Sequence, residues 1–328
     1  MALISRFWKK RKNRTDNGVG FQSLISKPQC IFVLNTMKIA VYAKSVRDPK
    51  HQAGFGELLM ALSKRGHEIW LPPSLEDHVH MNIGSSMPVR VFDYFSVGGE
   101  NADVLICVGG DGTILDTLSI VRDSGVPVLA LNTGRLGFLA DVQLENLGVA
   151  LDDIEKGNYT IETRSLLHLE SSHPLFDYTF ALNDFVIHKK ETSSMIVVHA
   201  YLNGEFLNSY WSDGLIISTP TGSTGYSLSC GGPIIFPKSD SFVITPIAPH
   251  NLNVRPVVVS DDVVISFEIE GRASSYLASL DSRSQSISGE VNMAIRKADH
   301  GLNLMRLSNI HFLDTLRSKL HWGFDKRN

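Results

Sequence analysis

The fold is decided by a stretch of ten residues, Val104 to Thr113, which reads VLICVGGDGT. Its five apolar residues, Val104–Val108, are typical of a strand that is buried on both faces of a parallel sheet. Two glycines then let the chain turn, and the pattern of Thr113–Arg122 predicts a helix. A buried strand that passes through a glycine turn into a helix is typical of an open α/β sheet, where ligands bind at the carboxyl ends of the strands.

The same alternation of strand and helix extends on both sides of this stretch, from residue 37 to about residue 142. Apolar runs predict strands over Lys38–Tyr42, Glu68–Leu71 and Val126–Leu131, and apolar residues at helical spacing predict a helix over Gln52–Arg65. Strands that alternate with helices imply a parallel, doubly wound sheet. We therefore expect residues 37–142 to form an α/β domain.

A different pattern begins after a predicted helix at Leu144–Lys156. Short β-type runs separated by Gly, Ser, Asn and Asp favour a second, mostly antiparallel β domain over residues 143–307. A last amphipathic stretch within residues 308–322 is predicted to be a helix that packs back on the first domain. The predicted β runs are Tyr159–Leu169, Tyr178–His188, Met195–Leu202, Leu215–Ser218, Phe242–Pro246, Val257–Val259 and Val263–Ile269.

The composition allows a large buried core, because 43% of the 328 residues are hydrophobic and 20% are charged. It excludes disordered, collagen-like and disulfide-scaffold proteins. No run of about 18 apolar residues is present, so we expect no transmembrane helix and no membrane partner. The cysteines Cys30, Cys107 and Cys230 are too few and too scattered for a disulfide framework or a zinc site, which favours a cytoplasmic location.

Charge is divided unevenly along the chain. Residues 1–36 hold seven Lys or Arg and one acid, Asp16, whereas the rest of the chain holds 24 bases and 33 acids. Such a head could be a targeting peptide or a nucleic-acid arm, but polar residues 13–20 leave no apolar stretch for a secretory signal. Because Met37 starts a predicted strand, we interpret residues 1–36 as a basic extension, disordered or non-native, and expect no nucleic-acid partner.

The turn Gly109–Thr113 is suited to phosphate, because glycine backbone and the free N–H groups of a helix N-terminus can approach phosphate oxygens. It is neither a Walker sequence, since no Lys-Ser/Thr follows, nor the G-x-G-x-x-G fingerprint. The carboxylate of Asp111 beside bound anions indicates a base for an attacking hydroxyl, or a ligand for a metal that bridges it to phosphate. The alternative is that Asp111 only caps the helix.

This turn resembles the signature of a kinase superfamily that contains NAD kinases, diacylglycerol and sphingolipid kinases, and 6-phosphofructokinases. Further segments are similar to those of NAD kinases: Asn132–Leu139 (NTGRLGFL), Leu182–Ile187 (LNDFVI), Ser212–Ile234 (SDGLIISTPTGSTGYSLSCGGPI), and Ala248–His250 with Arg255–Pro256. The matches keep their order and span about Met37 to Trp322. By this resemblance the chain is identified as a member of the bacterial NAD kinase family.

The resemblance implies an NAD+ kinase, a phosphotransferase with an alcohol group as acceptor. Such an enzyme moves the γ-phosphoryl group of ATP to the 2′-hydroxyl of the adenosine ribose of NAD and produces NADP. The resemblance also implies a nucleotide-binding first domain, an NAD-binding second domain, and a homo-oligomer, dimer or tetramer. The implied cofactor is a divalent metal, Mg²⁺, which is carried with ATP and needs no cage of protein ligands.

Matched residue by residue, the resemblance makes Asp111 the catalytic base and assigns NAD to Asn183 and Asp184, for which an Asx turn is the local alternative. Tyr226 would place its ring against a base or ribose. Gly225 stands where the family usually has Ala, and we expect that difference to change affinity only slightly. The other predicted substrate- or nucleotide-binding residues are Gly110, Gly112, Thr113, Asn132, Asp213, Thr224, Ser229, His250 and Arg255.

Some of these positions have plain structural alternatives: Asp213 as a turn residue, His250 as a structural histidine and Arg255 as a surface cation. Three other functions compete with an NAD kinase: a lipid kinase, a non-catalytic NAD sensor and a dehydrogenase. A lipid kinase is disfavoured by the acidic body of the chain and by the segment Ser212–Ile234. A non-catalytic NAD sensor is disfavoured by Asp111, Asn183 and Asp184, and a dehydrogenase lacks its fingerprint.

Overall fold

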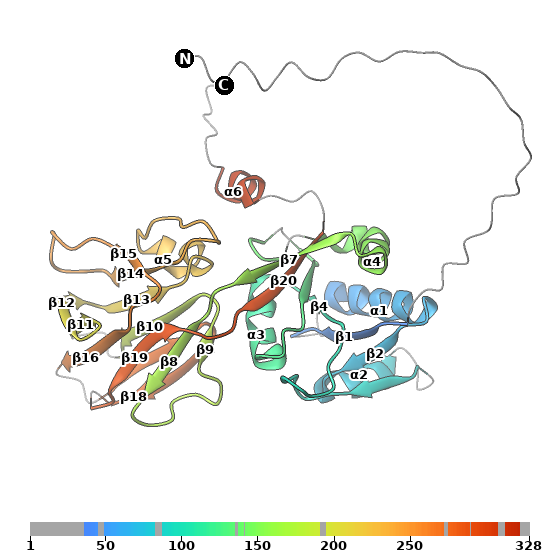
Figure 1. Ribbon diagram of the computed structural model, residues 1–328, viewed down its shortest axis with the longest axis horizontal. Helices are drawn as coiled ribbons and strands as arrows, with labels where there is room; N and C mark the ends of the chain where they lie inside the picture. Colours follow the sequence, from blue (N-terminus) through green and yellow to red (C-terminus); the bar gives the residue numbers. More distant parts are fainter. Residues whose placement is uncertain are drawn as a thin grey trace, which may run out of the picture. The chain divides into compact units, whose positions relative to one another are not determined.

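The structure is a computed structural model that describes residues 36–44, 49–82, 87–134, 137–140, 142–190, 195–271, 275–288, 290–307 and 312–321. Residues 35–328 form one unit, and all the elements named below belong to it (Figure 1). The predicted basic extension lies outside the described residues apart from Thr36. Arg135 and Leu136, within the segment that resembles NAD kinases, also lie outside them.

The strand at the centre of the sequence argument, β4 (Val104–Val108), is buried at every residue and lies inside a sheet of eight described strands. Its neighbours pair in parallel, which confirms the predicted parallel sheet. In spatial order the sheet runs β3 (Val89–Val91), β2 (Glu68–Leu71), β1 (Lys38–Tyr42), β4, β5 (Val128–Asn132), β20 (Leu302–Leu307) and β7 (Tyr159–Arg164), with β6 (Val142–Gln143) beside β5. Among these pairs only β20 with β7 is antiparallel.

Helices cover both faces of this sheet, as a doubly wound fold requires. The apolar sides of α1 (Pro49–Lys64), α2 (Pro73–Asn82) and α4 (Leu147–Lys156) share one core with one face, whereas α3 (Asp111–Val121) packs on the other. The chain therefore leaves β1 toward one face and β4 toward the opposite face. The carboxyl ends of β1 and β4 mark the switch point of the sheet, where open α/β sheets bind ligands.

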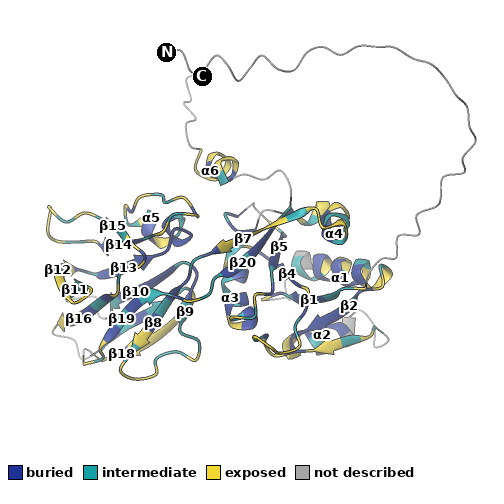
Figure 2. Ribbon diagram, viewed as in Figure 1, coloured by how far each residue is buried: buried dark blue, intermediate teal, exposed yellow. Residues whose placement is uncertain are grey.

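The second part of the chain is a sandwich of two antiparallel sheets, which confirms the predicted class. Buried apolar residues from both sheets, such as Ile196 and Phe185, form one core between them, and Figure 2 shows it as dark blue ribbon. One sheet has the order β12 (Glu205–Ser212), β11 (Ile196–Leu202), β16 (Ile265–Gly271), β19 (Met293–Lys297), β8 (Leu167–Ser171) and β9 (Phe180–Ala181). The other has the order β15 (Val257–Ser260), β14 (Ser241–Ile247), β13 (Gly214–Ser218), β10 (Asp184–Lys189), β17 (Tyr276–Leu280) and β18 (Arg283–Ile287).

Two predicted strands are each divided between different sheets. The run Tyr159–Leu169 becomes β7 in the eight-stranded sheet and β8 in the sandwich, and the run Tyr178–His188 becomes β9 and β10 in opposite sheets of the sandwich. The return strand β20 also joins the eight-stranded sheet, although residues 143–307 were expected to be one β domain. The connection from β7 to β8 contacts the connection from β19 to β20, since the amide of Ala298 donates to the carbonyl of Leu166 at 3.0 Å. The domain boundaries themselves stay a prediction.

Short helices complete the described residues. A 3-10 turn at Gly222–Thr224 leads into α5 (Tyr226–Ser229), and another at Leu144–Asn146 leads into α4. The last helix, α6 (Phe312–Leu320), carries Phe312, whose ring lies 6.3 Å from that of Phe138 and 5.3 Å from that of Phe236. No helix in the described part of the chain is long and apolar enough to cross a membrane.

Candidate active site

The glycine turn between β4 and α3 is tightly built on one side and open on the other. Gly109 has φ +153°, and a Cβ at this position would lie 2.3 Å from Oγ1 of Thr113, so only glycine fits there. Thr113 is 9% exposed and packs beneath the turn. A Cβ at Gly110 or Gly112 would meet no atom within 4 Å. The turn therefore leaves space above its backbone where a ligand can approach.

The side chain of Asp111 accepts three backbone hydrogen bonds from a neighbouring loop. Oδ2 accepts from the amide of Phe138 at 2.8 Å, and Oδ1 accepts from the amides of Leu139 and Ala140 at 3.1 and 3.0 Å. The N-cap of α3 is Gly110, and no side chain makes a cap hydrogen bond there, so Asp111 is not the helix cap. A carboxylate has about four acceptor positions, which leaves one on Oδ2 for a ligand.

The loop that holds Asp111 is itself fixed by hydrogen bonds. Nδ2 of Asn132 donates to the carbonyl of Ala140 at 3.3 Å, and Arg306 donates to the carbonyl of Leu139 at 3.0 Å. A Cβ at Gly137 would lie 1.8 Å from Oδ1 of Asp111, so the loop approaches the carboxylate as closely as backbone can. Asn132, which was predicted to bind nucleotide, is 3% exposed, and its amide group helps to shape this loop.

The predicted NAD-binding pair, Asn183 and Asp184, stands where the chain enters β10. The segment after β13 packs directly on it: Thr219 donates its amide to the carbonyl of Asn183 at 2.9 Å and its Oγ1 to the carbonyl of Leu182 at 2.5 Å. A Cβ at Gly222 would lie 2.1 Å from the carbonyl oxygen of Asn183. Two segments that lie far apart in the sequence therefore meet at Asn183, with backbone against backbone.

A cavity of about 530 Å³ opens in front of this pair. It brings together three predicted residues, Asn183, Asp184 and Tyr226, and adds residues that the sequence did not single out. The added residues are Leu115, Val186, His188, Leu277, Ser279, Asp281 and Ser282. Leu115 lies one helical turn after Asp111, about 6 Å along α3. Asp111 itself is not among the residues that line this cavity, and α3 connects it with the cavity wall at Leu115.

The carboxylate of Asp184, in the wall of this cavity, has a strongly perturbed pKa. Burial first, and then the nearby charge of Asp281, together raise its pKa from 3.8 to about 7. The residue is 7% exposed. Tyr226, which is 42% exposed, also has a raised pKa, through burial and then through Cys230, Asp184 and Asp213. Both shifts favour the neutral, protonated form of the side chain.

The raised pKa of Asp184 has a consequence for stability. Below about pH 3.8 the Asp184 side chain is protonated in both the folded and the unfolded protein. Between pH 3.8 and about 7 it is protonated only in the folded protein, so unfolding releases a proton and stability falls as the pH rises through this window. We expect the free energy of unfolding of the wild type, relative to Asp184→Asn, to fall by about 4 kcal/mol over the window. Urea unfolding at about pH 4, 6 and 8 without NAD measures it, and parallel pH profiles of the two proteins would contradict it.

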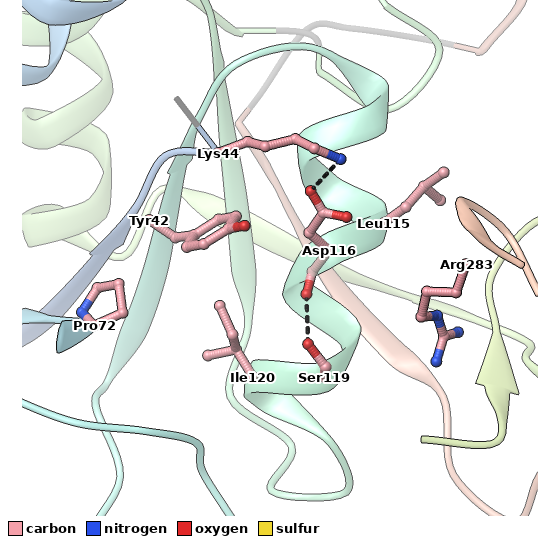
Figure 3. A pocket seen from close by; sticks show the side chains of 8 residues that line it. All are labelled: Tyr42, Lys44, Pro72, Leu115, Asp116, Ser119, Ile120 and Arg283. Atoms are coloured by element: carbon pink, nitrogen blue, oxygen red, sulfur yellow. Dashed lines mark hydrogen bonds and ion pairs between the residues drawn. The ribbon is translucent and has the colours of Figure 1, made fainter. Parts of the chain in front are cut away.

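A second cavity, of about 430 Å³, lies along α3 at the carboxyl ends of β1 and β2. Figure 3 shows Lys44, just after β1, reaching over to Asp116 on α3; their N–O distance is 2.9 Å. Arg283 also lines this cavity, and it donates to the carbonyls of Tyr178 and Phe180. Burial raises the pKa of Tyr42, the aromatic side chain of the cavity, to about 12, so that hydroxyl stays protonated.

Other predicted residues lie outside both cavities. Asp213 forms an ion pair with Lys189 at 2.6 Å, and Thr224 donates its Oγ1 to the carbonyl of Thr221 at 3.1 Å. Ser229, near the end of α5, is exposed. His250 is exposed, and its backbone amide donates to the carbonyl of Trp211 at 2.9 Å. Arg255 lines a separate cavity of about 690 Å³ that shares no lining residue with the one beside Asn183.

Some of the cavity-lining residues that were not predicted could have been found from the spacing of side chains along strands and helices. Side chains alternate along a strand, so Asp184 on the cavity side of β10 places Val186 and His188 there too. Leu115 follows Asp111 by four residues and shares its side of the helix. Leu277, Ser279 and Asp281 join through the pairing of β10 with β17, which aligns Val186 with Ser279 and His188 with Leu277. That pairing spans about ninety residues, and no local pattern announces it.

Comparison with known proteins covers both halves of the chain. Residues 93–159 match the family model of the ATP-NAD kinase N-terminal domain, and residues 182–307 match that of the ATP-NAD kinase C-terminal domain. The NAD kinase of Christiangramia forsetii is 42% identical over 295 residues, which are 89% of this chain and 100% of that protein. The NAD kinase of Cytophaga hutchinsonii is 52% identical over 227 residues, which are 69% of this chain and 78% of that protein.

Two solved structures share the fold. An NAD kinase from Archaeoglobus fulgidus, in complex with ATP, matches with a TM-score of 0.64 and 27% identity over 87% of this chain and 99% of that chain. Yeast NADH kinase, complexed with NADH, matches with a TM-score of 0.77 and 22% identity over 88% of this chain and 89% of that chain. At 22% identity the second match shows the fold alone.

A glycine turn that leads from a buried strand into α3, a carboxylate held at that turn and a cavity whose wall carries Asn183 and Asp184 define a class, the phosphotransferases that act on nucleotides. Within this class the chain belongs to the NAD kinase family, since both domain models and close relatives along most of its length agree. Members of this family are ATP-dependent phosphotransferases that produce NADP, and the chain is an enzyme of this kind.

Proposed function

We propose that this enzyme attaches the γ-phosphoryl group of ATP to the 2′-hydroxyl of the adenosine ribose of NAD, with Asp111 as the general base. One observation carries the proposal. Asp111 is fixed by three backbone amides at an open glycine turn, keeps an acceptor position on Oδ2, and lies one helical turn before Leu115 in the wall of the cavity beside Asn183.

The base acts by geometry more than by reactivity. A ribose hydroxyl is a poor nucleophile at neutral pH, and a carboxylate within hydrogen-bond reach accepts its proton as the bond to phosphorus forms. The loop that binds Asp111 restricts the carboxylate to one orientation, so no side-chain freedom is lost when the substrate arrives. The open backbone at Gly110 and Gly112, and the N-terminus of α3, would face the phosphates.

The acceptor nucleotide would occupy the cavity of about 530 Å³. Asn183 offers a donor and an acceptor, and Asp184 can accept from a sugar hydroxyl. Tyr226 begins α5 at the rim, where its exposed ring could lie against a base or ribose. We infer supporting roles for Asp213, Thr224, Gly225 and Ser229, which belong to the same segment as Tyr226, Ser212–Ile234. We further propose that His250 and Arg255 contact the nucleotide.

We infer that Mg²⁺ enters with ATP. Among the described residues no group of three or more His, Cys, Asp or Glu could hold a metal ion. Mg²⁺ needs no such group, because it takes one or two carboxylates together with the phosphates of its nucleotide. When bound, the ion would neutralise charge on the transferring phosphoryl group. Addition of EDTA should stop turnover, and turnover that survives chelation would contradict a metal requirement.

We also infer a homo-oligomer located in the cytoplasm. Large apolar side chains are exposed on the outermost strands of the sandwich, Phe206 and Trp211 on β12 and Val258 on β15, where a second copy could cover them. Light scattering that gives the mass of one subunit would contradict this. The cysteines Cys107 and Cys230 are unpaired, which suits a reducing compartment. Recovery of the protein outside the cytoplasmic fraction would contradict that location.

Turnover tests the proposed function directly. Purified protein incubated with NAD, ATP and Mg²⁺ should form NADP, measured with an NADP-specific dehydrogenase. A parallel reaction with NADH determines the redox form that the cavity accepts. Protein that binds NAD and forms no NADP or NADPH would contradict the proposal and would favour a non-catalytic NAD sensor.

A further inference from the structure

The Asn183–Asp184 turn is held by a residue from the hairpin turn after β17, the strand that pairs with β10. The carboxylate of Asp281 accepts from three successive backbone amides: that of Leu182 at 2.9 Å, that of Asn183 at 2.7 Å and that of Asp184 at 3.2 Å. The amide of Asp281 in turn donates to the carbonyl of Asp184 at 3.0 Å. Hydrogen bonds therefore run in both directions between the two segments, and they fix the backbone from which both acceptor side chains project.

Asp281 makes these bonds from a strained backbone position. It is the first residue of a two-residue hairpin turn between β17 and β18, and its φ is +51°. Glycine adopts this conformation without steric cost, whereas a residue with a side chain does not. Glycine at this position would lack a side chain, whereas aspartate supplies the carboxylate that binds the amides of Leu182–Asp184. The strain is thus coupled to a contact with the candidate acceptor site.

The rest of the hairpin turn connects to both parts of the chain. Arg283, whose charge opposes the raised pKa that burial gives Asp281, donates to the carbonyls of Tyr178 and Phe180 just before the acceptor pair. Oγ of Ser282 donates to Oδ1 of Asp116 on α3 at 3.3 Å. The helix that starts at Asp111 and the turn that carries Asn183 therefore share one support.

We propose that Asp281 is a positioning residue of the acceptor site, whose carboxylate sets the backbone of Leu182–Asp184 and so aims Asn183 and Asp184 into the cavity. The inference rests on the proposed function, because it assigns that cavity to NAD. Asp281 also lines the cavity wall, but its carboxylate oxygens are engaged by backbone. It therefore acts on the substrate through its neighbours.

Two substitutions test this role. Asp281→Asn keeps the size of the side chain but turns an amide group toward backbone N–H groups, and Asp281→Gly removes the carboxylate while it relieves the positive φ. For both variants we expect the Kd for NAD, measured by calorimetry without ATP, and the KM for NAD to rise about 10- to 100-fold. The KM for ATP should change less than twofold. Asp262→Asn, at an exposed acid in the turn after β15, is the matched control and should leave all three constants unchanged.

The outcomes separate positioning from general stability. If Asp281 had a purely structural role, its replacement would lower the melting temperature or the active fraction and leave the Kd and the KM for NAD unchanged. If it is a positioning residue, Asp281→Gly should keep its melting temperature and lose affinity for NAD. Wild-type Kd and KM for NAD in a folded variant would overturn the proposal. Failure of both variants to fold would overturn it too, since Asp281 would then serve the fold as a whole. If the wild type binds NAD but makes no NADP, the proposed function fails while the Kd values still decide the role of Asp281.

Discussion

Replacement of Asp111 by Asn should lower kcat by about 10²- to 10⁴-fold while the Kd for NAD changes less than threefold. The variant keeps the shape of the side chain but presents one carbonyl oxygen where the carboxylate has two. Oδ2, which accepts from the amide of Phe138 and keeps an acceptor position, is the atom through which a ribose proton would leave. Initial rates at saturating ATP and Mg²⁺, together with calorimetric NAD binding, measure both quantities.

The structure adds a complication that the experiment must address. Because three loop amides bind the carboxylate, Asp111→Asn also turns an NH₂ group toward N–H donors and weakens the loop. Asp103→Asn is the matched control, since Oδ2 of Asp103 accepts the amide of Lys38 at 2.7 Å at the amino end of β4, away from the site. It should keep kcat within about twofold, as expected for a site remote from the chemistry. Near-normal turnover of Asp111→Asn with NAD bound would contradict the assignment of the base.

Local patterns were sufficient for the parallel sheet, because each of its inner strands is an apolar run with its own flanking turn or helix. They were not sufficient for β7 and β20. The run Tyr159–Leu169 is continuously β-like, and nothing local reveals that the chain changes sheet after Arg164. The helix α2 was also missed, since Pro73–Asn82 mixes polar and apolar residues without a strong helical period.

The candidate site follows the same division. Asn183, Asp184 and Tyr226, which the sequence grouped and which line one cavity, belong to segments with their own signatures. What supports them is non-local: Asp281 is 97 residues or more from the amides that it binds, and the partners of Asp111 lie 27 to 29 residues along the chain. Hydrogen bonds to backbone leave little trace in the sequence, because any residue can supply an amide. Asn132 illustrates the converse, since its motif suggested a ligand and its amide group shapes a loop.

Replacement of Gly222 by Ala should raise the KM for NAD by about 10²-fold and lower the free energy of unfolding by about 2 kcal/mol. A Cβ at this position would lie 2.1, 2.5 and 2.7 Å from the carbonyl oxygen, carbonyl carbon and Cα of Asn183. All three are backbone atoms, so no side-chain rotation relieves the contact. The segment after β13 and the turn at Asn183–Asp184 must therefore separate. Asn183 then shifts relative to Asp184 and to the cavity wall.

Gly225, three residues further along, supplies the control for this test. A Cβ there would lie 3.2 Å from the carbonyl oxygen of Gly222, which needs a shift of only a few tenths of an ångström, and 3.8 Å from Nδ2 of Asn183, an ordinary contact. Gly225→Ala should therefore change the KM for NAD by less than about threefold, since one methyl contact carries little free energy. Steady-state kinetics and urea unfolding of the two variants make the comparison. Equal effects at both positions, or a wild-type KM in Gly222→Ala, would show that the approach of Gly222 to Asn183 does not set the acceptor site.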